Sequence, residues 1–349
     1  MSERTFGLAL PLHAPLDELV ETARTAEALG YRHLWATDDR LQRDVFVVLA
    51  AIALATRELQ LGPGVTNPFS RRPGLIATAI ATLDELSGGR AVLGLGAGGT
   101  NHRALGVRRE APVAALAETV ALIRALLAGE EVTTKGRVVQ AESARLDFTP
   151  TRSSIPLYVG ARAPRMLELA GELADGVIVG NVASPDGWSY AYERIAAGAA
   201  RAARGVDDVV LNAWVYCSIA EDSAAALAAI RPMVATSLAT SRSALATLGL
   251  TPPSQYVERM DERGWSLERD AVAYAGEVVP DETLRWFGLA GTAGECAAAL
   301  HELLARFPQI SQVAIVPAAP AGGTVPDVVR SFMRDVVPLA THPQEVGVQ

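Results

Sequence analysis

The chain has 349 residues, of which half are hydrophobic and 20% are charged, and its formal net charge is -8. This composition permits a large buried core, while the acidic balance without any Lys- or Arg-rich run excludes a typical nucleic-acid-binding protein. There is no signal-peptide pattern and no run of eighteen apolar residues, and Cys217 and Cys296 lack a CxxC spacing. We therefore expect a cytoplasmic protein with unpaired thiols and with neither a membrane nor a nucleic-acid partner.

Short apolar strands alternate with longer helical segments along the chain. The first helix, at 15–29, places Leu16, Leu19 and Ala23 on one face and ends at Gly30. Eight strands are predicted, at residues 5–10, 32–37, 59–62, 91–95, 156–159, 176–180, 209–219 and 312–316. The later helices are predicted at residues 45–56, 73–86, 113–127, 164–173, 186–203, 223–248, 293–306 and 325–336.

Two segments interrupt this alternation. Residues 130–149 predict a small hairpin with a turn at Gly136, and residues 250–290 predict an irregular or short-helical insertion. The strands are continuous apolar runs, which is typical of parallel sheets buried on both faces. We predict one α/β domain over residues 1–349, a (β/α)8 TIM barrel with insertions after the helix of strand four and after strand seven. An open Rossmann-type sheet is the alternative.

The active site of a TIM barrel lies at the C-terminal ends of its strands, so the loops after the strands are the candidate positions. Aspartates follow strand two, and glycine-rich segments follow strands three to six. The candidate residues in these loops are Asp38, Asp39, Gly64, Val65, Thr66, Gly96, Ala97, Gly98, His102, Gly160, Ala161, Arg162, Ala163, Gly180 and Asn181.

The run from Gly94 to Gly99 matches GxGxxG after a strand. A dinucleotide fingerprint also needs a helix at once and an acidic residue about 20 positions later, at the end of the next strand. Here residues 100–111 are loop-like and Glu118 falls inside a helix. The glycines therefore predict either a close approach of a flat ring to the backbone or simply a tight turn.

The segment from Gly160 to Pro164 joins strand five to a helix. Free backbone N–H groups at a helix N-terminus bind anions, and Arg162 or Arg165 would add charge. The segment is our candidate phosphate site, the alternative being an ordinary loop with a surface arginine. The pairs Arg71-Arg72 and Arg108-Arg109 are expected to be solvated or, at most, to contact an anion.

Few residues offer acid, base or metal chemistry. Asp38 and Asp39 could donate or accept a proton, although Asp38 is equally suited to capping a turn. His102 follows the glycine loop, and the five histidines form no HxH or HExxH pattern, so no metal site is expected. No GxSxG elbow or P-loop lysine is present.

At these same loops the sequence resembles the luciferase-like flavin and deazaflavin oxidoreductases, and among them the coenzyme F420-dependent methylenetetrahydromethanopterin reductases. The resemblance covers nearly the whole chain. It is carried by residues 61–69 (LGPGVTNPF), 77–98 (ATAIATLDELSGGRAVLGLGAG), 156–161 (PLYVGA), 166–176 (MLELAGELADG) and 289–292 (LAGT).

The resemblance implies a TIM barrel, usually a homodimer, that binds a deazaflavin. Gly64-Val65 would be a non-prolyl cis peptide forming a bulge against the ring, bordered by Asp38 and the turn at 96–98. The segment 160–163 would receive the cofactor phosphate, and Gly180 with Asn181 would lie along the cofactor's side chain.

The sequence departs from the archaeal reductases near the reacting ring. Ala9 stands where they have a glutamate, Gly99 where they have an aspartate, and Asp39 where they have a histidine. These changes leave the general acid unassigned, with Asp39 and His102 as the remaining catalytic candidates.

Three functions are compatible with the sequence. The favoured one is a coenzyme F420-dependent oxidoreductase that transfers a hydride to or from a small organic substrate, with the insertion at 250–290 forming part of the substrate pocket or a lid. The second is an FMN-dependent luciferase-like monooxygenase, which would need a dry pocket. The third is a cofactor-binding barrel without catalysis. The fold alone does not identify the substrate.

Overall fold

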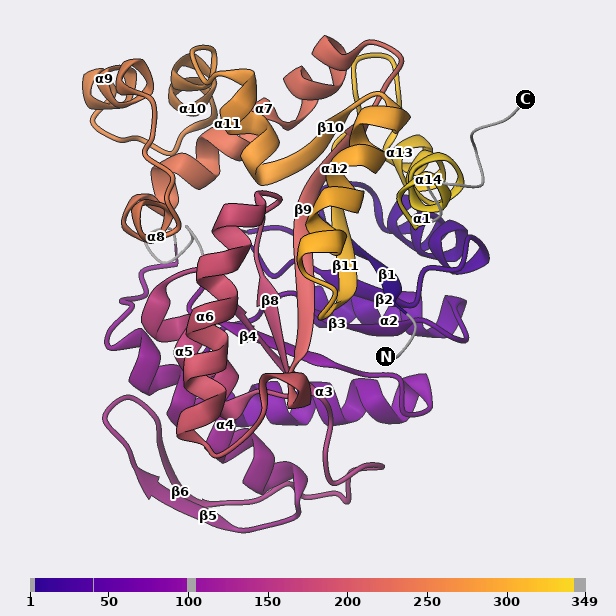
Figure 1. Cartoon of the computed structure of the whole chain (residues 1–349). Helices are drawn as coiled ribbons and strands as arrows, with labels where there is room; N and C mark the ends of the chain where they lie inside the picture. Colours follow the sequence, from indigo (N-terminus) through magenta and orange to yellow (C-terminus); the bar gives the residue numbers. More distant parts are fainter. Residues whose placement is uncertain (1–3, 40, 99–104, 342–349) are drawn as a thin grey trace.

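A computed structural model describes residues 4–39, 41–98 and 105–341 of the chain. Its centre is a parallel barrel, around which the helices form an outer layer (Figure 1). The barrel strands are β1 (Thr5–Leu10), β2 (His33–Ala36), β3 (Gln60–Pro63), β4 (Leu93–Gly96), β7 (Leu157–Ala161), β8 (Gly176–Val179), β9 (Val210–Ile219) and β11 (Ile310–Pro317).

The strands are ordered β3-β2-β1-β11-β9-β8-β7-β4, and all neighbours along this path are parallel. Two isolated bridges, Leu61 with Ala91 and Thr66 with Leu95, join β3 to β4 and so close the ring. The predicted TIM barrel is confirmed, and the open-sheet alternative is wrong. All eight strands lie where the apolar runs predicted them, within a few residues at the ends.

Helices cover the barrel in the predicted alternation, and local signals set their bounds. Proline stands in the first turn of five of them, and the side chains of Asp44, Ser184, Asp222, Thr292 and Thr324 cap helix starts, two of which also carry such a proline. The covering helices are α1 (Leu16–Ala28), α2 (Val45–Ala55), α3 (Pro73–Ser87), α4 (Pro112–Leu127), α5 (Pro164–Leu173), α6 (Pro185–Arg201), α7 (Ser223–Thr240), α12 (Ala293–Arg306), α13 (Val325–Ser331) and α14 (Val337–Thr341).

The segment 223–248 is not one helix as predicted. It divides into α7 and α8 (Arg242–Thr247), because Ser241 leaves the helical region with φ -128° and ψ 19°. The hydroxyls of Thr236 and Thr240 bond to backbone carbonyls one turn earlier, a local competition typical of Ser- and Thr-rich helix ends.

Among the described helices, α7 alone has the length and hydropathy that a membrane span would require. It packs instead against β9 and β10 of the barrel, with residues such as Leu227, Ile230 and Leu238 buried. Its apolar composition therefore reflects contact with the protein's own core.

Both predicted insertions are present. Hairpin β5 (Val132–Lys135) and β6 (Gln140–Ala144) lies outside the barrel beside α4 (Figure 1). The second insertion contains α9 (Ser254–Glu262), α10 (Arg269–Gly276) and α11 (Asp281–Phe287), which gather next to α7. One strand was missed: β10 (Gly288–Gly291) pairs with the end of β9. Two of its four residues are glycine, which is depleted in strands, so the sequence carries no strand signal there.

Aromatic and polar side chains fill the barrel interior. Trp35 packs edge-on against Tyr158, with ring centroids 5.0 Å apart, and lies 6.3 Å from the ring of Trp214. Below them Asn212 donates a hydrogen bond to Gln312, which donates one to Tyr158. The barrel is therefore a packed core, and any ligand site must lie above the two tryptophans.

Candidate active site

A branched cleft opens at the C-terminal ends of the barrel strands. Its two arms have volumes of about 980 and 750 Å³ and share a floor made of Gly64, Val65, Arg162, Asn181 and Trp214. The hairpin arm runs from this floor between the starts of α4 and α5 to the turn of hairpin β5–β6. The α10 arm runs from the same floor to α7 and α10.

The floor is shaped by the Gly64-Val65 peptide, which is cis, as the resemblance implied. A Cβ added at Gly64 would lie 2.6 Å from Trp214 and 2.7 Å from Trp35, so the backbone rests directly on the tryptophan pair. Only glycine permits this contact. Ligands above the floor therefore meet Gly64 and Val65, with the tryptophans beneath.

The predicted glycines around Val65 have a supporting role. A Cβ at Gly96 would come within 2.5 Å of the Val65 side chain, and one at Gly160 within 2.9 Å. Gly96 and Thr66 are buried and line neither arm, whereas Ala97 and Gly98 do line the hairpin arm. The glycines thus leave room for the Val65 side chain, as well as for a flat ligand ring above the floor.

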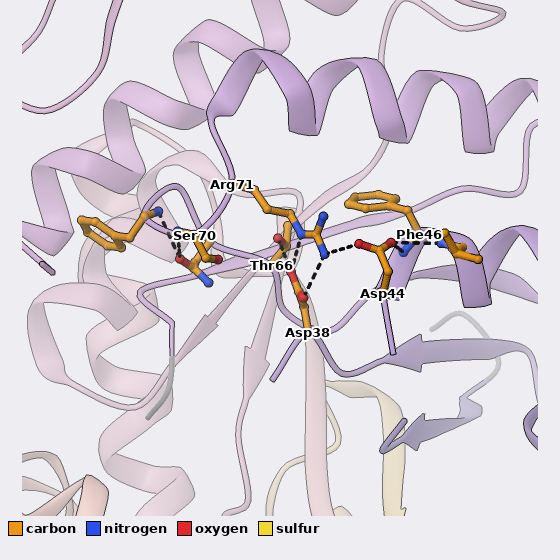
Figure 2. Close-up of polar contacts among 9 residues, drawn as sticks. Asp38, Asp44, Phe46, Thr66, Ser70 and Arg71 are labelled. Carbon is orange, nitrogen blue, oxygen red and sulfur yellow. Dashed lines mark hydrogen bonds and ion pairs between the residues drawn. The ribbon is translucent and has the colours of Figure 1, made fainter. Parts of the chain in front are cut away.

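Asp38 belongs to an ion network on the β2–β3 side of the cleft (Figure 2). Its carboxylate accepts hydrogen bonds from Thr66 Oγ1 at 2.7 Å and from Arg71 Nε at 2.9 Å. Arg71 Nη2 also donates to Asp44, 2.8 Å away, and Asp44 caps the start of α2. The expectation that Arg71 is solvated is wrong: its ion pair with Asp38, together with the bond from Thr66, joins the ends of β2 and β3.

The two catalytic candidates from the sequence differ in what can be said of them. Asp39 lines the α10 arm beside Asp38, at the junction with the floor. His102 lies outside the described residues. Asp39 is therefore the candidate that the fold brings to the cleft.

The segment after β7 meets the floor as predicted. Gly160, Ala161, Arg162 and Ala163 all line the hairpin arm, and α5 begins at Pro164 immediately after them. Arg162 Nη1 is buried and has no hydrogen-bond partner in the described part of the chain. Burial lowers the pKa of Arg162, although Tyr216 nearby opposes this. An unpaired guanidinium at the junction of two arms is a ready anion contact.

Gly180 lines the hairpin arm, and Asn181 beside it belongs to the floor. Apart from its chain neighbours, no described residue has an atom within 4 Å of a Cβ built on Gly180, so the backbone there faces open space. Asn181 Nδ2 donates to the Tyr216 hydroxyl at 3.1 Å, while Asn181 Oδ1 is buried without a partner among the described residues. Tyr216 also shares a 2.8 Å hydrogen bond with Ser237 of α7. Burial raises the pKa of Tyr216, which keeps its hydroxyl protonated at neutral pH.

Sequence reasoning missed Trp214 and Tyr216, both of which line the α10 arm. A signal was available, since Asn212, Trp214 and Tyr216 alternate along β9, the period expected of residues on one face of a strand. Nothing local marks that face as the interior, because every central residue of β9 is buried.

Comparisons with known proteins agree with this geometry. The model of the luciferase-like monooxygenase family matches residues 4–307. The 5,10-methylenetetrahydromethanopterin reductase of Methanolobus tindarius is 35% identical, over 95% of this chain and 99% of its own. The corresponding enzyme of Archaeoglobus fulgidus is 33% identical, over 95% and 98%.

A solved structure matches the fold over the same length. The coenzyme F420-dependent tetrahydromethanopterin reductase of Methanopyrus kandleri superposes with a TM-score of 0.84 at 28% identity. The match covers 97% of this chain and 99% of that one. The similarity therefore includes the strand-end loops that form the cleft.

Proposed function

This chain belongs to the luciferase-like monooxygenase family, and we propose that it is a coenzyme F420-dependent oxidoreductase acting on a small organic substrate. The observation that carries this is the branched cleft, whose floor and hairpin arm are made by the strand-end loops in which the sequence resembles F420-dependent reductases. Two arms on one floor suit a cofactor and a substrate that must meet. The bound deazaflavin would supply the carbon centre that accepts or donates the hydride.

The residues of the hairpin arm suit a flat, anionic cofactor. Gly64, Val65, Ala97 and Gly98 offer a narrow backbone surface for the ring, supported from behind by Thr66 and Gly96. The N-terminus of α5, with Gly160, Ala161 and Ala163 before it, offers N–H groups to a phosphate. The unpartnered Nη1 of Arg162 adds a donor there, and Gly180 with Asn181 borders the intervening side chain.

The α10 arm is proposed as the substrate site. Its wall includes Met233 and Val272, so an apolar substrate body would be shielded from water, as hydride transfer requires. Asp39 is proposed as the residue that holds or moves a proton, and His102 as a second candidate. Asp38 would act by holding the β2 and β3 ends in place.

The chain is also proposed to be a cytoplasmic homodimer. Cys217 and Cys296 are buried free thiols, which suits a reducing compartment.

Helix α2 is almost wholly apolar, yet Val47 and Leu54 on its outer face are 64% and 74% exposed. A second copy of the chain covering this face would explain why two large apolar side chains are exposed in the monomer. Light scattering of the wild type and of Leu54→Glu tests this: a monomeric wild type would contradict the dimer.

The test of function is a fluorescence titration of the purified protein with coenzyme F420 and, in parallel, with FMN. Micromolar binding of F420 with weak binding of FMN is expected, followed by F420-dependent turnover in a screen of hydride donors and acceptors. Preferential FMN binding with oxygen uptake would replace the proposal by a monooxygenase. Tight F420 binding without any turnover would leave a cofactor-binding barrel.

A further inference from the structure

The hairpin arm carries an unusual excess of positive charge. Among the described residues, the arginines that line it are Arg109, Arg137, Arg162 and Arg165, and no described aspartate or glutamate lines it. None of the four forms an ion pair with another described residue, although 14 ion pairs are recorded elsewhere in the described chain. In a protein of net charge -8 this concentration favours an anionic ligand.

These arginines extend well beyond a single phosphate. Arg162 lies at the floor, while Arg109, Arg137 and Arg165 are exposed towards the outer end. Arg109 precedes α4, Arg165 lies in the first turn of α5, and Arg137 comes from the turn of hairpin β5–β6. Three separate elements thus place cations along one arm, which is the arrangement a multiply charged, extended anion would need.

The turn that carries Arg137 is fixed by Glu118 of α4. The carboxylate of Glu118 accepts hydrogen bonds from the backbone N–H groups of Arg137, Val138 and Val139, at 2.8, 2.9 and 2.8 Å. Partial burial raises the pKa of Glu118, but these hydrogen bonds outweigh it and the net pKa is lowered. The glutamate is therefore ionised at neutral pH and holds the hairpin against the barrel.

Gly136 makes this anchoring possible. A Cβ at Gly136 would lie 2.5 Å from Glu118 Oε2 and 2.8 Å from the carbonyl oxygen of Val139. Any other residue would push the turn and the carboxylate apart. The hairpin insertion is thus tied to the arm at the residue next to Arg137.

We propose that Arg109, Arg137 and Arg165 form a binding site for the oligoglutamate tail of coenzyme F420, and that hairpin β5–β6 serves to bring Arg137 to it. This rests on the proposed function. Beyond its phosphate the coenzyme bears a lactyl group and γ-linked glutamates, and each glutamate adds carboxylate charge. Guanidinium groups match carboxylates in shape and charge. With the ring on the floor and the phosphate at residues 160–163, the tail leaves along the outer arm.

The experiment measures dissociation constants of the wild-type protein by deazaflavin fluorescence. Three ligands are compared: F420 with several glutamates, F420 with none, and the deazaflavin precursor that lacks the phosphate. Affinity is expected to rise with tail length, about tenfold from no glutamate to several, and this gain should shrink as salt is raised. The double variant Arg109→Gln, Arg137→Gln, which keeps Arg162 and Arg165 beside the proposed phosphate site, should lose most of the tail-dependent gain and keep its affinity for the tail-free coenzyme.

Two further variants test whether the gain in affinity depends on where the arginines lie rather than on the total charge of the protein. Arg145→Gln, on the same hairpin but facing a different cavity, should leave every affinity unchanged. Gly136→Ala retains all four arginines but displaces the turn, and should lose part of the same gain. Equal wild-type affinity for all tail lengths would overturn this inference and leave the proposed function standing. Failure to bind any deazaflavin would overturn both.

Discussion

The two sides of the cleft differ in how their charged groups are paired. On the β2–β3 side, the carboxylates of Asp38 and Asp44 are both bonded to Arg71. On the β7–β9 side, Arg162 Nη1, Asn181 Oδ1 and Trp214 Nε1 are buried without partners among the described residues. Buried polar atoms without a partner among the described residues also occur near β2, where Trp35 Nε1 and Thr37 Oγ1 are examples. The contrast therefore lies in the charged groups: Arg71 is paired with two carboxylates, whereas Arg162 has no ion pair in the described part of the chain and is available to a ligand.

The largest expected effect comes from removing Arg71, to which both carboxylates of the β2–β3 side are bonded. Arg71→Met would leave Asp38, whose side chain is only 15% exposed, with Thr66 as its hydrogen-bond partner among the described residues. Removing one member of a buried ion pair is strongly destabilising, so we expect a loss of about 3 kcal/mol in unfolding free energy. Urea denaturation measures it. The neighbouring Arg72→Met, at an exposed arginine without a recorded ion pair, serves as the control and should change stability by less than about 0.5 kcal/mol.

An arginine-to-methionine substitution on the β7–β9 side should change the unfolding free energy in the opposite direction. Arg162→Met removes a guanidinium whose pKa burial already lowers and whose Nη1 has no partner in the described chain. The ligand-free protein is therefore expected to gain roughly 1 kcal/mol of stability while its affinity for F420 falls. A ligand-free Arg162→Met protein less stable than the wild type would show that this arginine is structural, and the contrast between the two sides would fail.

The smallest expected effect is a pH dependence of the unfolding free energy that arises from Asp44 on the β2–β3 side. Burial raises the pKa of Asp44, but hydrogen bonds from Arg71, Val47 and Phe46 outweigh it and hold the pKa below 3.8. The folded protein therefore binds this proton less tightly than the unfolded chain does. Its contribution is present above about pH 4 and is lost as the pH falls through the depressed pKa.

Denaturation of Asp44→Asn between pH 6 and pH 3 checks this effect. The variant should be less stable than the wild type at pH 6, and the difference should shrink towards pH 3. A constant difference over the range would contradict the assignment. No such titration is expected for Arg162, because a guanidinium remains charged over this range.

The sequence predicted the elements well because their signals are local. Continuous apolar runs marked the eight strands, and Thr292 or Pro164 marked helix starts that the structure reproduces. The strand β10 escaped prediction because it is defined by its pairing with β9. The break at Ser241 escaped prediction because the hydroxyl bonds of Thr236 and Thr240 that accompany it give no interruption in the apolar pattern.

The candidate site was predictable only in part. Loops after the strands were enough to gather Gly64, Ala97, Arg162 and Asn181 around one cleft. The pairing of Asp38 with Arg71 spans 33 residues, and the contact of Glu118 with the hairpin turn spans about 20. No short motif encodes either, because each arises from the way separate elements meet in space.

The tryptophan pair beneath the floor makes the cleft optically observable. Trp35 and Trp214 are two of the five tryptophans of the chain, and Trp214 lines both arms. A chromophore resting on Gly64 and Val65 would lie close enough to these indoles to take up their excitation energy. The protein thus carries its own donor fluorophores at the point where the two arms join, and the quenching of its ultraviolet emission reports when that point is filled.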